Sequence, residues 1–132
     1  MSVFIDTSAL LAVLDADDTN QQLAASAWAR LLAAGEELVT SNYVVVEAIA
    51  VTQRRLGLDA VRSLVEDMLP AVPVEWVDST AHQVGLASML SAAQCHLSLV
   101  DCVSFELLRS FHLRRVFGFD PRFQRQGFEC LT

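Results

Sequence analysis

The sequence contains no lysine, and all nine of its basic residues are arginines, against sixteen acidic residues. The formal net charge of −7 is unfavourable for a protein that binds nucleic acid through charge alone. Bound divalent cations would offset part of this charge, so that exclusion weakens if some of the acidic residues form a metal site.

Cysteine, glycine and proline are also scarce. The three cysteines, Cys95, Cys102 and Cys130, show no CxxC spacing, and the three histidines form no HxxxH or HExxH pattern. These spacings do not favour a zinc site, and the odd cysteine count predicts reduced, mostly buried thiols. Five glycines and three prolines favour long helices with short connections.

No apolar run approaches the roughly 20 residues that a transmembrane helix needs, so we expect no membrane association. No basic region precedes the first apolar residues, and without a signal peptide the expected location is the cytoplasm. The length of 132 residues and the 53% hydrophobic content predict a single globular domain over residues 1–132.

Apolar periodicity and turn signals predict alternating strands and helices. The expected strands are 3–5, 38–40, 74–77, 115–119 and, at an edge, 128–131. The expected helices are 8–14, 19–34, 42–56, 59–69, 79–93 and 98–111, with the acidic turn 15–18 capping the second of them. This order predicts an α/β fold with a central, mostly parallel sheet of four to five strands flanked by helices.

Four acidic residues lie beside apolar segments: Asp6, Glu47, Asp101 and Asp120. A carboxylate in apolar surroundings must be paired, protonated or bound to a metal. Asp6 and Asp120 come at the carboxyl ends of predicted strands, where open α/β sheets bind their ligands. Hard divalent cations are the natural partners of several carboxylates in one cleft.

Three of these acids also have a local explanation that leaves the metal hypothesis open. Asp6 can cap the helix that follows it, and Asp101 fits a capping box with Ser98. Asp120 precedes Pro121, a common start of a helix. Glu47 lacks such an explanation, because it shares a helix face with Val44 and Val51. We expect it to turn toward the core and to find a partner elsewhere, in a shared site or in a buried ion pair.

Weaker candidates accompany the acids. The pairs Arg54–Arg55 and Arg114–Arg115 are candidate phosphate contacts, although solvated helix ends explain them equally well. Ser8 and Ser104 are candidates to hydrogen-bond a metal-ligating carboxylate or a phosphate.

Four segments in order, 6–12, 38–57, 97–105 and 117–123, resemble the segments of PIN-domain ribonucleases that carry their acidic residues. Within that family the chain resembles the compact bacterial toxins of the VapC type. The resemblance implies an endoribonuclease that needs Mg²⁺, with Mn²⁺ as a substitute, and that cleaves RNA as the toxin of a toxin–antitoxin pair. It implies metal-binding and catalytic roles for Asp6, Glu47, Asp101 and Asp120, a small antitoxin partner and a homodimer.

Two positions depart from the family pattern. Gly118 stands where many relatives carry Thr or Ser, and Val100 replaces a common Thr, so positioning hydroxyls are lost. The alternative is a non-catalytic or weakly active RNA-binding or interaction module, against which four intact acids argue. A phosphatase with an aspartyl nucleophile is disfavoured, because the second residue after Asp6 is Ser8 and the chain has no lysine.

Overall fold

The computed structural model describes residues 2–91 and 96–132, and its centre is a five-stranded sheet. All neighbouring strands pair in parallel, in the order β3-β2-β1-β4-β5. The strands are β1 (Val3–Ile5), β2 (Leu38–Ser41), β3 (Val74–Glu75), β4 (Arg115–Phe117) and β5 (Glu129–Leu131). The predicted α/β class, the parallel sheet and the edge strand are therefore confirmed.

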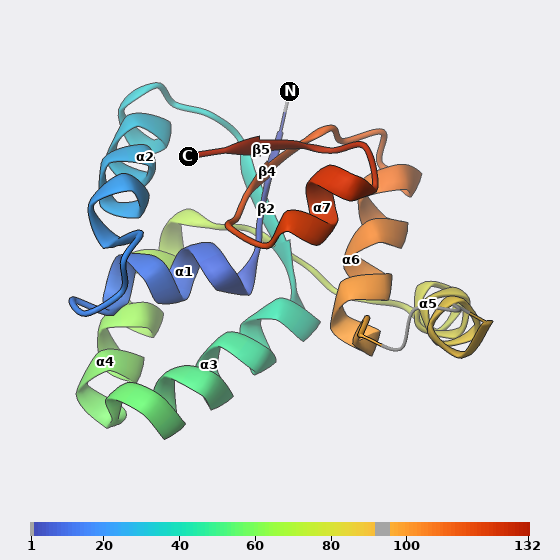
Figure 1. The fold of residues 1–132 in the computed structure, drawn as a ribbon, viewed down its shortest axis with the longest axis horizontal. Coiled ribbons are helices and arrows are strands. Elements are labelled where there is room, and N and C mark those ends of the chain that lie inside the picture. The colour runs from blue at the N-terminus through green and yellow to red at the C-terminus, as the bar shows by residue number, and fades with distance from the viewer. Residues whose placement is uncertain (1, 92–95) are drawn as a thin grey trace.

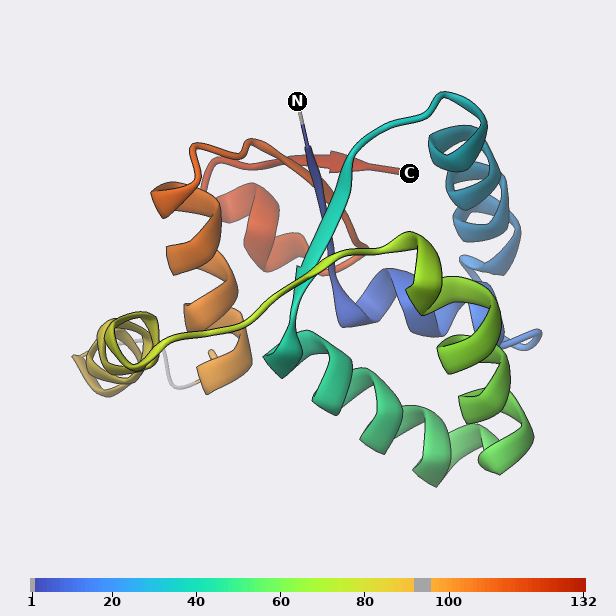
Figure 2. The same ribbon diagram turned by 180° about the vertical axis from the view of Figure 1, so that it is seen from behind.

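Each predicted helix has a counterpart in the structure with shifted ends. The helices are α1 (Thr7–Leu14), α2 (Gln21–Ala33), α3 (Asn42–Leu56), α4 (Leu58–Ser63), α5 (Ser79–Ser91), α6 (Leu99–Ser110) and α7 (Pro121–Arg125), a short helix that was not among the expected ones. Figures 1 and 2 show α2 and α4 on one side of the molecule and α6 on the other, with α5 outermost. The predicted helix end at Ala93, like Cys95, lies outside the described residues.

The core surrounds β1, the central strand, whose three residues are all buried. A parallel strand covered on both faces reads as a continuous apolar run, which is the pattern of Val3-Phe4-Ile5. In Figure 1 the strands β1 and β2 run downward, so that their carboxyl ends meet the first turns of α1 and α3. The fold thus gathers several helix starts along one edge of the sheet.

Two predicted strands end early because side chains take their last backbone donors. The amide of Val77 donates to Asn42 Oδ1 at 2.7 Å, so β3 stops at Glu75. The amide of Phe119 donates to Ser8 Oγ at 2.9 Å, so β4 stops at Phe117. The second of these bonds lies at the edge where the acids were predicted.

Two helix predictions need correction. The acidic turn does not cap α2: Asn20 is the cap residue and makes no side-chain cap bond. Instead Asp15 and Asp18 accept from the amides of Asp17 and Asn20, because short acidic side chains bind the backbone two residues on. The predicted helix 59–69 is interrupted: α4 passes into a π-turn at Leu64–Met68 and a 3-10 turn at Leu69–Ala71, where Pro70 disfavours further helix.

Candidate active site

All four predicted acids line one open pocket of about 310 Å³ at the carboxyl ends of the strands. They come from four separate elements, since Asp6 precedes α1, Glu47 lies in α3, Asp101 in α6 and Asp120 precedes α7. The other lining residues are Thr7, Ser8, Leu11, Val51, Arg55, His96, Ser98 and Arg122. The structure therefore brings together the whole predicted quartet.

Asp6 is the most deeply placed of the acids, with only 5% of its surface exposed. Its Oδ2 accepts from the Ser8 amide at 3.2 Å and from Ser8 Oγ at 2.6 Å, so it caps α1 as expected. Burial, and then the nearby charges of Asp101 and Asp120, raise the pKa of Asp6 to about 6, although the Ser8 bonds oppose that rise. The carboxylate is held in place, and among residues 2–91 and 96–132 it forms no ion pair.

Asp101 is held by the capping box that the sequence predicted. Its amide donates to Ser98 Oγ at 3.1 Å, and its Oδ2 accepts from the Ser98 amide at 3.1 Å. Oδ2 also lies 3.3 Å from Nη1 of Arg122. Helix capping and a place in the pocket are thus compatible, because a helix start fixes a carboxylate rigidly.

Asp120 caps α7 and is engaged by the same arginine. Its Oδ1 accepts from the Arg122 amide at 2.9 Å and from Nε at 3.0 Å, while Oδ2 lies 2.7 Å from Nη2. Burial alone would raise the pKa of Asp120, but the hydrogen bonds and charge of Arg122 outweigh it and hold that pKa below its usual value.

Glu47 is half-buried on the pocket side of α3, so the expectation that it turns into the core is wrong. No ion pair of Glu47 is found in the described part of the chain, which removes the buried-pair alternative there. Of the two neighbouring arginines, Arg55 lines the pocket, and it lies two turns along the helix. Glu47 therefore faces the shared site with its carboxylate available.

Arg122 is a pocket residue that sequence reasoning did not single out. Its guanidinium contacts Asp120 and Asp101 and also donates to the carbonyl of His96. A signal was present, because an arginine two positions after a helix cap can fold back onto the capping carboxylate. Its contact with Asp101 was not readable, since those residues meet only through the fold.

Of the two serine hydroxyls predicted to hydrogen-bond a carboxylate or a phosphate, only that of Ser8 bonds a carboxylate among the described residues. Ser8 bridges the carboxylate of Asp6 and the amide of Phe119, as a positioning residue should. The buried Ser104 hydroxyl has no hydrogen-bond partner among the described residues, so its predicted bond to a carboxylate is not found. At Gly118 an added Cβ would lie 3.2 Å from Asp6 Cβ and 3.3 Å from Ser8 Oγ, so glycine here leaves room for Ser8.

The pocket offers the donor chemistry that a hard divalent cation requires, namely several carboxylate oxygens and an acid without direct counter-charge. No group of three such side chains in residues 2–91 and 96–132 is already arranged around a common point. Both oxygens of Asp120 and one oxygen of Asp101 face the guanidinium of Arg122. The residue types in the pocket fit a divalent metal.

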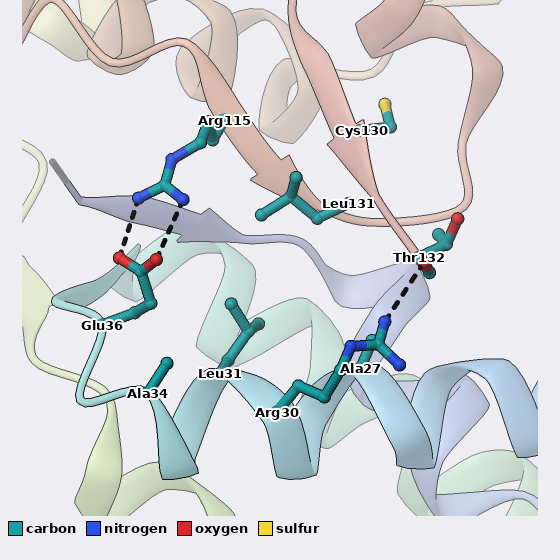
Figure 3. A pocket seen from close by; sticks show the side chains of 9 residues that line it. All are labelled: Ala27, Arg30, Leu31, Ala34, Glu36, Arg115, Cys130, Leu131 and Thr132. Atoms are coloured by element: carbon teal, nitrogen blue, oxygen red, sulfur yellow. Dashed lines mark hydrogen bonds and ion pairs between the residues drawn. The ribbon is translucent and has the colours of Figure 1, made fainter.

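A second pocket, of about 390 Å³, lies between α2 and the strands β4 and β5, and the pair of Glu36 and Arg115 in it lies at the amino end of the sheet (Figure 3). There Arg115 binds Glu36 through two bonds, of 3.1 and 2.8 Å, and Arg30 donates to the Thr132 carbonyl at 3.4 Å. Leu31 and Leu131 supply apolar walls. Of the arginine pair 114–115, Arg115 therefore lies outside the pocket that the four acids line.

Comparison with known proteins agrees with this architecture. The family model of the PIN domain matches residues 3–129. The 23S rRNA-specific endonuclease VapC20 of Mycobacterium tuberculosis is 28% identical over 127 residues, covering 96% of this chain and 95% of the relative. Its crystal structure, described as that of a sarcin–ricin loop cleaving toxin, aligns with a TM-score of 0.82 at 27% identity over 96% of this chain and 95% of that one.

A more distant structure shares the fold alone. A chain in the crystal structure of FitAcB from Neisseria gonorrhoeae aligns with a TM-score of 0.71 at 15% identity, over all of this chain and 97% of that one. Within the described residues, no helix combines the length and apolarity needed to cross a bilayer. The family match spans nearly the whole chain, and its fold places the four acids together: this chain belongs to the PIN domain family.

Proposed function

We propose that this protein is a metal-dependent endoribonuclease and the toxin of a toxin–antitoxin pair. The observation that carries the proposal is the convergence of four carboxylates from four elements on one open pocket. Similarity to VapC20, named as a 23S rRNA-specific endonuclease, supports RNA as the substrate class. Burying like charges together costs free energy, so a fold that retains such a cluster indicates a site that needs it.

Asp6 and Asp101 are the main metal ligands in this proposal, and Asp120 and Glu47 complete the shell or orient a water molecule. Mg²⁺, or Mn²⁺ in its place, would supply activation of water and stabilisation of the leaving oxygen. Ser8 holds the Asp6 carboxylate from one side, and the capping box holds Asp101. These contacts hold the Asp6 and Asp101 side chains at the pocket in the metal-free protein, which lowers the cost of assembling the site.

Arg55 supplies the contact to RNA in this proposal. It lines the pocket from α3, and its side chain is exposed. A guanidinium is well suited to a phosphate, because it can donate two parallel hydrogen bonds. In a chain of net charge −7, the cation and this arginine would provide the positive charge that the RNA backbone requires.

The decisive experiment is an RNA cleavage assay of the wild-type protein and of Asp101→Asn, with Mg²⁺, with Mn²⁺ and after chelation. We expect cleavage only with a divalent cation, and a loss of at least about a hundredfold in the variant. Asp67→Asn, which changes an exposed acid outside the pocket, is the control and should cleave normally. Equal cleavage by Asp101→Asn and wild type would overturn the proposal.

We also propose a small antitoxin as a partner and a homodimer as the assembly. The homodimer is supported by α5, which packs on α6 and leaves Val84 and Leu90 exposed, Leu90 at 74%. Exposed apolar side chains on an outer helix are typical of a protein interface. Leu90→Glu should convert the dimer to a monomer in light scattering; a wild-type monomer would exclude the proposed dimer.

The antitoxin proposal is tested by expressing the protein in cells. Growth arrest that is relieved when a small protein encoded beside it is expressed too would support the proposal.

A further inference from the structure

The pocket contains its own cation, the guanidinium of Arg122, and this cation holds the oxygens that a metal would need. Both carboxylate oxygens of Asp120 accept from it, at 3.0 and 2.7 Å. Oδ2 of Asp101 lies 3.3 Å from Nη1. A third contact, from Nη1 to the carbonyl of His96, fixes the guanidinium to the segment before α6. All three nitrogens of the guanidinium are therefore occupied within the site.

These contacts compete with metal binding on geometric grounds. A carboxylate oxygen that accepts a hydrogen bond from an arginine directs its lone pairs toward that arginine, and a cation at the same oxygen would repel the guanidinium. Oδ1 of Asp120 accepts from both the amide and Nε of Arg122, and Oδ2 accepts from Nε and Nη2, so the guanidinium takes up lone pairs of both oxygens that a metal would share. The lack of a preformed three-ligand group among the described residues is consistent with this competition.

Resting on the function proposed above, we infer that Arg122 is a resident counter-ion that pairs with Asp101 and Asp120. A divalent metal must displace it to bind these acids. A bound ion would be held by Asp101 and Asp120 in place of the guanidinium, which would then leave these carboxylates and the carbonyl of His96. Arg122 thereby lowers the apparent metal affinity while it protects the cluster of like charges in the metal-free protein.

Calorimetric titration of the metal-free protein with Mn²⁺ tests this competition without measuring activity. We expect Arg122→Gln to bind Mn²⁺ about tenfold more tightly than wild type, because a charge-assisted competitor is gone. Arg125→Gln, on the exposed side of the same helix α7, removes the same net charge without contacting the acids in the described structure and controls for the change of potential. Arg122→Lys, which keeps the charge but cannot form the paired contacts, should bind Mn²⁺ with an affinity between those of Arg122→Gln and Arg125→Gln.

A second measurement uses the wild-type protein and does not depend on the folding of any variant. The NMR signal of the Arg122 Nε–H group, identified by its loss in Arg122→Lys, should shift and exchange faster with water as Mg²⁺ saturates the site. An unmoved signal at saturation, or equal Mn²⁺ affinity of Arg122→Gln and Arg125→Gln, would overturn the inference alone. Absence of saturable binding in wild type and in every variant would overturn the proposed function as well.

Discussion

The two ends of the sheet differ in how their charged side chains are paired. At the amino end, Glu36 and Arg115 form one pair with two hydrogen bonds, and the charges balance locally (Figure 3). At the carboxyl end, four carboxylates line one pocket into which two arginines reach, and Arg122 is divided between two acids. The amino end is built as a structural ion pair, whereas the carboxyl end keeps an excess of negative charge.

That difference separates stability from function. The charges of a locally balanced pair offset each other, so a mutation that removes the pair should change stability slightly and leave activity unchanged. A cluster with excess charge costs free energy in the empty protein and regains it on binding a cation. The following predictions test whether the two ends differ in this way, beginning with the largest expected effect.

The Asp6 carboxylate should make the protein less stable at neutral pH than at pH 4. The folded-state pKa, about 6, lies above the unfolded value near 3.8, so the folded state binds the proton more tightly. The free energy of unfolding should therefore fall as pH rises from about 4 to about 6, by roughly 3 kcal/mol, and then level off. Urea unfolding of the metal-free protein across this range measures it, and Asp6→Asn should flatten this part of the profile; an unchanged slope would contradict the assignment.

Glu47→Gln should weaken Mn²⁺ binding and Mg²⁺-dependent cleavage by about 10- to 100-fold while leaving the free energy of unfolding nearly unchanged. The reason is that Glu47 is half-buried and has no ion pair in the described part of the chain. Calorimetry, a cleavage assay and urea unfolding give the three values. Glu66→Gln, at an exposed position outside the pocket, is the matched control, and equal metal affinities of the two variants would argue against a role for Glu47 in the site.

Ser8→Ala should lower the free energy of unfolding by about 1–2 kcal/mol, because the Phe119 amide loses its acceptor and Asp6 loses a donor. Loss of the bond that opposes the rise should also move the pKa of Asp6 further upward. Urea unfolding measures the first effect, and the position of the Asp6 side-chain carbon signal in an NMR pH titration measures the second. Ser26→Ala, on the exposed side of α2, should change neither quantity.

Glu36→Gln should have the smallest effect, a slight fall in the melting temperature with unchanged Mn²⁺ affinity and unchanged RNA cleavage. The pair with Arg115 is partly exposed, so solvent already screens much of its attraction. Differential scanning calorimetry and the same metal titration check both parts. A loss of cleavage comparable to that of Glu47→Gln would show that the two ends of the sheet are coupled. It would contradict the distinction between a structural pair at one end and a functional cluster at the other.

The outline of the fold was readable because local signals agreed with one another. Val3-Phe4-Ile5 has the apolar run of a central parallel strand, and Ser98 with Asp101 has the spacing of a capping box. The two errors in strand length came where a side chain from elsewhere in the chain intervened. Ser8 took the amide that would have extended β4, and Asn42 took the one that would have extended β3.

The candidate site, like the fold, was predictable where local signals marked its residues. Each acid of the quartet was marked by its own neighbourhood, as a strand end, a helix start or an acid on an apolar helix face. The orientation of Glu47 was not, because a helix face can meet either a core or an open pocket and periodicity does not distinguish them. The double contact of Arg122 was not predictable either, since only one of its two carboxylate partners is near it in sequence.

The sequence by itself therefore determined the α/β order of elements, the parallel sheet and the identity of the four acids, because capping, periodicity and strand-end placement act over a few residues. Only the tertiary structure decided how charge is shared among those acids. That sharing depends on distances between α1, α3, α6 and α7, which are fixed by the packing of the whole chain around β1. The excess of negative charge at one end of the sheet, and the arginine that partly offsets it, are properties of that packing.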